Sequence, residues 1–345
     1  MRKYFLALII AFTCFVFSNA LADDKVISPK EHIRSEEQTY LTFPEWYLVF
    51  SPDELASFIK DHNPSDFPFM GHIGQFWNGY YNMYQATKEK YPTNWGYHVM
   101  VMVIGVSTTV EYSIKWLYGN TIGRFSHWTS THGMTKEDKF AADVARDYVD
   151  FINVTPWYEY PFTTKLKHLW TDTDLTGPDM IRKWERKFAL SIEYGVKAVY
   201  GSLIKLGTKT AYDAPIPVTA MVIDALPDGM QEELPELNVL KQEDNYVLIT
   251  VPRYAAFTEY ASQLAKNNIN FIEIAGNKKD ILLSVITPES AKKQPTDTHK
   301  VLFEQDIITQ DNKKRIIVLT KVNNLAMLLN NFMNKGYKIE HIYDY

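Results

Sequence analysis

The sequence predicts two domains: a mainly α-helical N-terminal domain, followed by a C-terminal α+β domain of ferredoxin-like type with a duplicated βαβ unit. All eight Trp lie between Trp46 and Trp184, and apolar residues in that region recur at helical spacing. Beyond it, the order strand, helix, strand occurs twice. We therefore expect an aromatic-rich helical domain over residues 40–207, a proline-containing linker over 208–244 and the α+β domain over 245–345.

The first residues are typical of a cleavable secretory signal peptide. Arg2 and Lys3 precede an apolar stretch from Tyr4 to Phe17, and Ala20-Leu21-Ala22 is a pattern that signal peptidase accepts. A spanning helix needs about 20 apolar residues, more than this stretch supplies. We expect cleavage near Ala22, an N-terminal extension over residues 23–39, and a periplasmic or secreted protein.

Composition excludes several kinds of chemistry. Cys14 is the only cysteine and lies in the predicted signal peptide, so the mature chain would have no disulfide, thiolate metal site or cysteine nucleophile. Without Arg2 and Lys3, 34 of the 36 basic residues remain against 41 acidic ones, a net charge of about −7. This charge disfavours nucleic acid as a partner. The sequence has no glycine-rich phosphate loop, and we expect no cofactor.

Helices are predicted in order from caps and periodicity. Ser51-Pro52-Asp53-Glu54 is a capping box with proline at the first helical position, which predicts a helix to about His62. Two more are expected near residues 72–90 and 97–118. Thr135 followed by acidic residues starts a helix to Asn153, and residues 178–206 form the longest candidate, with an apolar stripe of 3.6-residue period.

The C-terminal pattern changes to strands. The linker contains four prolines and one short strand candidate at residues 218–223. The two predicted βαβ units comprise residues 246–251, 255–267 and 269–274, and then 315–320, 322–335 and 337–343. Two added strands are expected at residues 281–286 and 301–309. Both helices would cover one face of a single sheet.

Three acidic or basic residues are candidates for catalysis. Glu45 stands between aromatic residues beside Trp46, an arrangement that also occurs in sugar-binding clefts. His72 is flanked by Gly71 and Gly74, so backbone could approach a ligand there; alternatively, Gly71 ends a turn and the His72 ring bonds a nearby carbonyl. Glu111 follows a very apolar run and could be a buried acid, or it could pair simply with Lys115 one helical turn later.

Other residues are candidates for ligand or metal binding. Trp46 and Trp77 offer ring faces and Arg124 a cation for a bound ligand. His127 and His132 could join a third group on a metal ion, although such spacing also arises by chance in polar loops.

The long helix over residues 178–206 also allows two interpretations. Arg182, Lys183, Arg186 and Lys187 beside the apolar stripe could lie on anionic lipid headgroups. The same pattern describes an ordinary amphipathic helix that packs its apolar stripe on its own domain, which the sequence favours.

No motif in the sequence identifies a particular reaction. The sequence favours a non-catalytic exported cell-envelope protein that binds an unknown envelope protein or an amphipathic ligand. One alternative is an exported hydrolase whose acid/base site lies in the helical domain and uses Glu45, His72 and Glu111. The other is a peripheral membrane-associated protein. Convergence of Glu45, His72, Glu111 and His127 on one cavity would favour the hydrolase.

Overall fold

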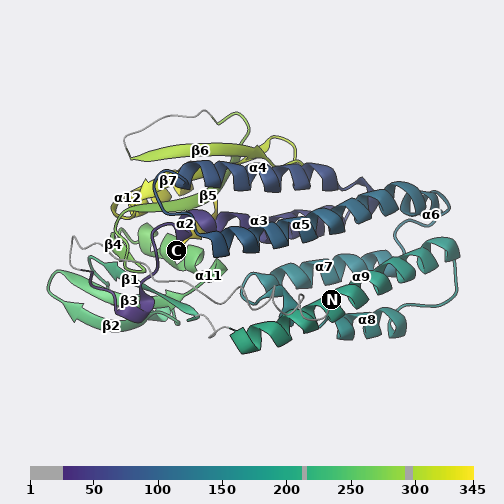
Figure 1. Ribbon diagram of the computed structural model, residues 1–345, viewed down its shortest axis with the longest axis horizontal. Helices are drawn as coiled ribbons and strands as arrows, with labels where there is room; N and C mark the ends of the chain where they lie inside the picture. The colour runs from purple at the N-terminus through teal and green to yellow at the C-terminus, as the bar shows by residue number, and fades with distance from the viewer. Residues whose placement is uncertain (1–25, 212–215, 292–297) are drawn as a thin grey trace.

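The computed structural model describes residues 26–211, 216–291 and 298–345, with side chains omitted for residues 207–211. The predicted signal peptide therefore lies outside the described residues. The described chain has a helical N-terminal part and a sheet-containing C-terminal part, as the sequence predicts. The strands gather at one end of the long axis, and the long helices extend from them toward α6 at the other end (Figure 1).

The helical part contains five helices of sixteen or more residues and several short ones. The long helices are α3 (Phe43–Phe58), α4 (Phe69–Thr87), α5 (Trp95–Tyr118), α7 (Lys136–Ile152) and α9 (Met180–Ala211). The short α-helices are α2 (Gln38–Leu41), α6 (Arg124–Trp128) and α8 (Phe162–Thr171). Single turns occur at η1 (Lys30–His32), η2 (Pro64–Asp66), η4 (Trp157–Glu159) and the π-helical η3 (Gly119–Gly123) between α5 and α6.

Two of the predicted helix starts can be checked against capping geometry. At α7 the Thr135 side chain accepts from the Asp138 N–H and the Asp138 side chain accepts from the Thr135 N–H, so this predicted start is confirmed. The predicted start at Ser51 is wrong, because α3 begins at Phe43 and continues through Pro52. Ser51 instead hydrogen-bonds the Tyr112 hydroxyl at 2.8 Å, and Glu54 accepts from Arg315. Tertiary contacts thus occupy the polar side chains that suggested a cap.

In the residues that the structure describes, eight strands form two antiparallel sheets. The first contains β1 (Val218–Ile223), β2 (Asn238–Glu243), β3 (Tyr246–Pro252) and β4 (Phe271–Ile274), with α10 (Met230–Glu233) and α11 (Ala255–Lys266) between strands. The second contains β5 (Asp280–Pro288), β6 (His299–Asp306), β7 (Lys313–Lys321) and β8 (Lys338–Tyr343), with α12 (Val322–Asn334) between the last two. Their orders are β2-β3-β1-β4 and β6-β7-β5-β8. Both β1 and β2 lie in the stretch expected to be a linker.

The ferredoxin-like duplication is not confirmed. The predicted strands do alternate with helices, but they divide between two sheets instead of forming one. In each group of four strands, the first strand lies between the third and the fourth and is antiparallel to both. The two sheets thus share one strand order. The sequence predicted the repeat of strand, helix and strand, but not this order.

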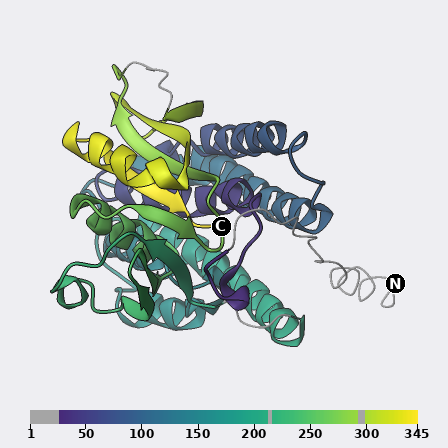
Figure 2. The ribbon, with the colours of Figure 1, turned by 90° about the vertical axis from the view of Figure 1, so that its left-hand side faces the viewer.

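The main core lies between the two sheets and the helices that follow β3 and β7. One hydrophobic cluster joins Ile249 of β3, Leu283 of β5, Phe257 of α11 and Leu329 of α12, all fully buried. Figure 2 looks onto this end of the molecule, with the strands and their helices toward the viewer.

The second sheet is also covered on its other face, which attaches it to the helical part. Alternate side chains of a strand point to opposite faces, so Leu282 and Ile317 face away from the main core. They pack with Tyr40 of α2, Phe43 of α3 and Met83 of α4.

Candidate functional site

The outward face of α9 is apolar. From Met180 to residue 206, the exposed residues are large apolar or aromatic ones apart from Ser202, although the side chain of Lys205, which pairs with Glu159, is also 41 % exposed. The apolar and aromatic ones, with exposed fractions that reach 69 % at Leu206, are Met180, Ile181, Trp184, Phe188, Ile192, Val196, Val199, Tyr200, Leu203 and Leu206. The stripe that the sequence favoured as the buried face of this helix is therefore its exposed face.

The four basic side chains near the start of α9 face the protein interior. Arg182, Lys183 and Lys187 are buried, and Arg186 is half-buried. Arg182 donates to Asp138 at 2.8 Å and to Glu185 at 3.1 Å, and Lys187 lies 3.6 Å from Glu137. These partners belong to α7 and to α9 itself. The interpretation that these cations lie on lipid headgroups is wrong, since the charges are already paired inside the protein.

Helix α5 repeats this arrangement. Its exposed residues include no charged side chain. The apolar ones are Trp95, Val99, Met102, Val103, Val106, Val110, Ile114, Trp116 and Leu117. We call the exposed apolar side chains of α5 and α9 together the two-helix face.

Helix α7 shows what an ordinary solvated helix of this protein looks like. Its exposed residues are all charged, and they are Lys136, Lys139, Asp143, Asp147 and Asp150. Ala141, Val144 and Val149 lie on its buried side. The usual amphipathic pattern thus holds for α7 and is reversed in α9.

Four charged side chains link α5 to α9. Lys115 lies 3.0 Å from Glu111 and 2.8 Å from Glu193, and Lys197 lies 3.1 Å from each of these carboxylates. The predicted pairing of Glu111 with Lys115 is confirmed, as part of a larger network. Burial raises the pKa of the Glu111 carboxyl, but Lys197 and Lys115 more than offset this and hold the pKa below its ordinary value. Glu111 is therefore an ionised partner of two lysines.

The same network shows that the two stripes lie on one side of the helix pair. Residue 111 pairs with 197 and residue 115 with 193, so the helices run antiparallel, as Figure 1 also shows. In each helix an exposed apolar residue comes one position before each network residue: Val110 precedes Glu111 and Ile192 precedes Glu193, as Ile114 and Val196 precede Lys115 and Lys197. One position is about 100° around a helix. Equal offsets in antiparallel helices place both stripes on the same side.

His72 lies in a buried cluster between the helices and the second sheet. Its Nε2 is 3.6 Å from Glu54, its Nδ1 is 3.2 Å from the Tyr47 hydroxyl, and its ring stacks on Phe67. Burial, with Arg315 as a second cause, lowers the pKa of His72 to about 3. At neutral pH the ring is therefore an uncharged, packed group.

Arg315 completes this cluster. The guanidinium is buried and donates to both oxygens of Glu340, at 2.5 and 2.7 Å, and to Glu54 at 3.0 Å. Burial lowers the pKa of Arg315, but Glu340 and Glu54 raise it above its ordinary value. The cluster holds α3 against β7 and β8 through paired charges.

Glu45 and the two tryptophan candidates have separate surroundings. Burial raises the pKa of the half-buried Glu45 to about 7, although Arg253 acts in the opposite direction. Trp46 stacks on His341 with ring centroids 3.5 Å apart. Trp77 donates its indole N–H to the Thr109 hydroxyl at 2.9 Å. Each ring is thus occupied by a contact within the protein.

The metal and cation candidates lie at the far end of the helical part. Arg124 is exposed and pairs with Asp66 at 2.9 Å. His127 is exposed on α6, and His132 lies 3.2 Å from Asp179. Within residues 26–211, 216–291 and 298–345, no group of three or more His, Cys, Asp or Glu is arranged to hold a metal ion.

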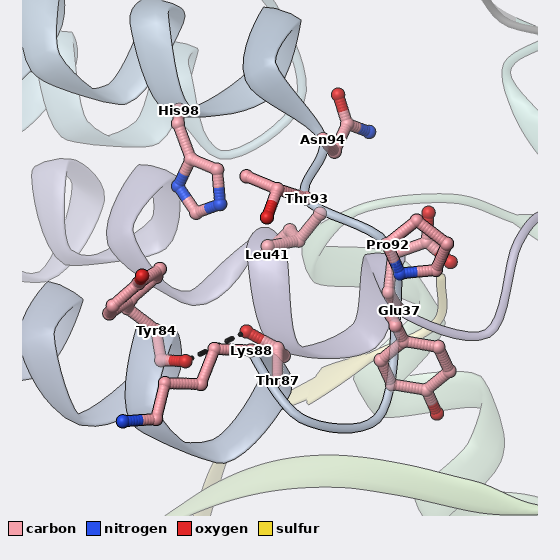
Figure 3. A pocket seen from close by; sticks show the side chains of 10 residues that line it. Glu37, Leu41, Tyr84, Thr87, Lys88, Pro92, Thr93, Asn94 and His98 are labelled. Atoms are coloured by element: carbon pink, nitrogen blue, oxygen red, sulfur yellow. Dashed lines mark hydrogen bonds between the residues drawn. The ribbon is translucent and has the colours of Figure 1, made fainter.

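Two hollows in the described part of the chain are lined by residues other than the candidates. The first, between α2, α4 and the start of α5, measures about 10 Å³, room for about one water molecule. Glu37, Tyr84 and His98 are among the residues around it (Figure 3). The second is an open hollow of about 430 Å³ beside α12, with five asparagines among its lining residues.

Glu45, His72, Glu111 and His127 thus have different surroundings. His72 contacts α3, Glu111 contacts α9, and His127 is exposed on α6. Sequence reasoning missed the two-helix face because it favoured packing of the α9 stripe on the protein's own helical domain. A signal was present, since the stripe of α9 continues over seven turns without one charged residue.

Comparisons with known proteins add no relative: no family model, curated protein or solved structure matches the chain. In the described residues, no helix combines the length and the hydropathy that crossing a membrane requires. The fold and the two-helix face define an α+β protein with a large exposed apolar surface.

Proposed function

We propose that the protein is a binding protein of the cell envelope that attaches to an apolar surface through the two-helix face. The single observation that carries this proposal is the reversal of polarity in α5 and α9, whose charges point inward and whose apolar side chains point outward. Export through the predicted signal peptide is part of the proposal.

The size of the face supports binding. Its exposed apolar area is on the order of 2,000 Å², whereas the largest apolar patch of a typical monomer is roughly 300–600 Å² and is often functional. Covering one quarter of the face would contribute on the order of 10 kcal/mol before the costs of association. The favourable free energy available for attachment is therefore large.

The proposal is tested by placing charge at the centre of the face. Val106→Asp combined with Val196→Asp changes one exposed residue in the middle of each stripe. Valine and aspartate have similar helix propensities, so the helices should persist. On a phenyl-substituted matrix, the unchanged protein should bind and elute only with detergent. The double variant should lose most of this retention, because a carboxylate is costly to bury without a partner.

Met327→Asp on α12 is the matched control, because Met327 is 53 % exposed and lies outside the face. Its retention should equal that of the unchanged protein, and circular dichroism with thermal unfolding should show that all three proteins are folded. Equal retention of the double variant and the unchanged protein would remove the two-helix face from the proposed function.

A further inference from the structure

The polar groups on the two-helix face identify the kind of surface that it fits. Ser107 of α5 and Ser202 of α9 are exposed. The hydroxyl of each donates to a backbone carbonyl one turn earlier in its own helix, at 2.8 and 2.7 Å. A protein interface carries about one hydrogen bond per 100–200 Å², or on the order of ten for a face of this size. Apart from the indole N–H groups of Trp95 and Trp116 and the Tyr200 hydroxyl, the face offers few groups that could make them, whereas hydrocarbon requires none.

The charges beneath the face are arranged as a hydrocarbon environment requires. Glu111, Lys115, Glu193 and Lys197 pair with one another between the helices. Ionisable residues near lipid chains are costly unless they face inward and are paired. No counter-charge from a partner is needed to neutralise this network.

Side-chain types also vary along the face. Its middle is aliphatic, with Val103, Val106 and Val110 on α5 and Val196 and Val199 on α9. Trp95, Trp116 and Trp184 lie toward the ends of their helices, whereas the exposed Phe188 and Tyr200 lie within the length of α9. Continuing from α5, α6 adds Phe125 and Trp128, the latter 82 % exposed. Trp and Tyr favour the boundary between lipid chains and headgroups.

From these observations we infer that the two-helix face lies against the hydrocarbon of a phospholipid layer. This inference rests on the proposed function and names the apolar surface that the face binds. The face inserts among acyl chains without attraction to headgroup charge, since Arg182, Lys187 and Lys197 lie in ion pairs on the inner side of α9 and Lys205 pairs with Glu159. Attachment should therefore be independent of anionic lipid and of salt.

The main competing occupant is a second copy of this chain. A stable dimer needs roughly 800 Å² from each partner, and the face is large enough to supply that area. Lipid is favoured because a self-complementary protein interface sets its register with polar and charged rim groups, and the apolar stripes of α5 and α9 contain no charged residue. The experiment must therefore separate lipid binding from self-association.

The test is flotation of the mature protein with vesicles of pure phosphatidylcholine. We expect most of the protein to float with the vesicles, equally at ~0.05 and ~0.5 M salt, because Coulombic attraction makes no contribution. Val106→Asp with Val196→Asp should reduce the floated fraction by about tenfold, and Met327→Asp should leave it unchanged. Tryptophan fluorescence should also be quenched by brominated acyl chains in the unchanged protein and in the Met327→Asp control.

Each contrary outcome has a defined meaning. Flotation only with anionic vesicles and only at low salt would overturn the inference in favour of electrostatic adsorption. Failure to float, together with a dimer in light scattering that the double variant dissociates, would also overturn it while leaving the proposed function intact. Failure to bind vesicles, the phenyl matrix or a second copy would remove the proposed function as well.

Discussion

At the scale of single residues, His72 shows how burial decides a role. Its ring is packed between Phe67 and the polar groups of Glu54 and Tyr47, and the pKa lies at about 3. Of the two neighbouring glycines, Gly71 is required by close packing and Gly74 is not. A Cβ at Gly71 would lie 2.7 Å from the Ile308 side chain, and one at Gly74 would meet nothing within 4 Å. The local pattern that suggested a ligand site therefore reflects close packing at Gly71.

The low pKa of His72 predicts a loss of stability in acid. An unfolded histidine binds a proton near pH 6.5, whereas the folded one stays neutral down to pH ~3. The contribution of His72 to stability is thus fully present above pH ~6.5 and is lost as the pH falls toward 3. Between pH 7 and 4, the free energy of unfolding should fall by about 3 kcal/mol more in the unchanged protein than in His72→Gln. Urea titrations at each pH measure this difference.

His62→Gln serves as the control, because His62 is exposed and its substitution should leave the pH dependence unchanged. Parallel stability curves for His72→Gln and the unchanged protein from pH 7 to 4 would show that His72 is protonated in the folded state. That result would reopen an acid/base role for its ring.

At the scale of elements, α9 is held by charges on its inward side. Lys187 of α9 is 0 % exposed and donates to the carbonyl oxygens of Leu169 and Thr173, near Glu137 of α7. A buried ion pair contributes little relative to apolar residues, but removing one partner leaves an uncompensated charge. The inward face of α9 therefore depends on keeping its charges matched.

Lys187→Met should consequently lower the free energy of unfolding by about 3–5 kcal/mol, since Glu137 would lose its cation. Adding Glu137→Gln should recover much of that loss, because the second change removes the orphaned charge. Chemical denaturation of both single variants and the double variant gives the coupling energy.

Lys139→Met, at an exposed position of α7, provides the comparison and should change stability by no more than about 0.5 kcal/mol. If Lys187→Met were as stable as this surface variant, the charges beneath the two-helix face would not be what holds α9 in place.

At the scale of the whole molecule, the two ends of the described chain meet. The backbone N–H groups of Ile27 and Ser28 donate to the Glu273 carboxylate in β4, at 3.0 and 2.7 Å. Arg34 donates to Asp344 and to the carbonyl oxygen of Tyr345. The segment that follows the predicted cleavage point is thus docked on the sheets, so a chain that starts near Asp23 retains these contacts.

Expression in a bacterial host with separation of the envelope fractions tests the predicted processing. We expect intact-mass and N-terminal sequencing of the exported protein to give a chain that starts at or near Asp23, because Ala20-Leu21-Ala22 is the predicted cleavage pattern. Ala22→Arg, which destroys the small residue before the cut, should block processing. An exported protein that still carries Met1 would contradict cleavage and require a second membrane contact in the proposed mode of attachment.

Local sequence patterns determined most of the long helices and strands of this protein. The helical period over residues 178–206 and the cap at Thr135 predicted α9 and α7, and the alternation of strand and helix predicted β3 to β8 with α11 and α12. These features depend on residues that are near in sequence, whose spacing sets which side chains share a face. The sequence also predicted that Glu111 would pair with Lys115, because the two lie one turn apart.

Only the tertiary structure decided which face of each helix points outward and how the strands divide between two sheets. Periodicity shows that α9 has an apolar side and a charged side, but it is unchanged by rotating the helix about its axis. The rotation is set by contacts between distant residues, such as Arg182 with Asp138 and Lys197 with Glu111. Because these pairs satisfy the charges inside the protein, the apolar stripes of α5 and α9 remain on its surface.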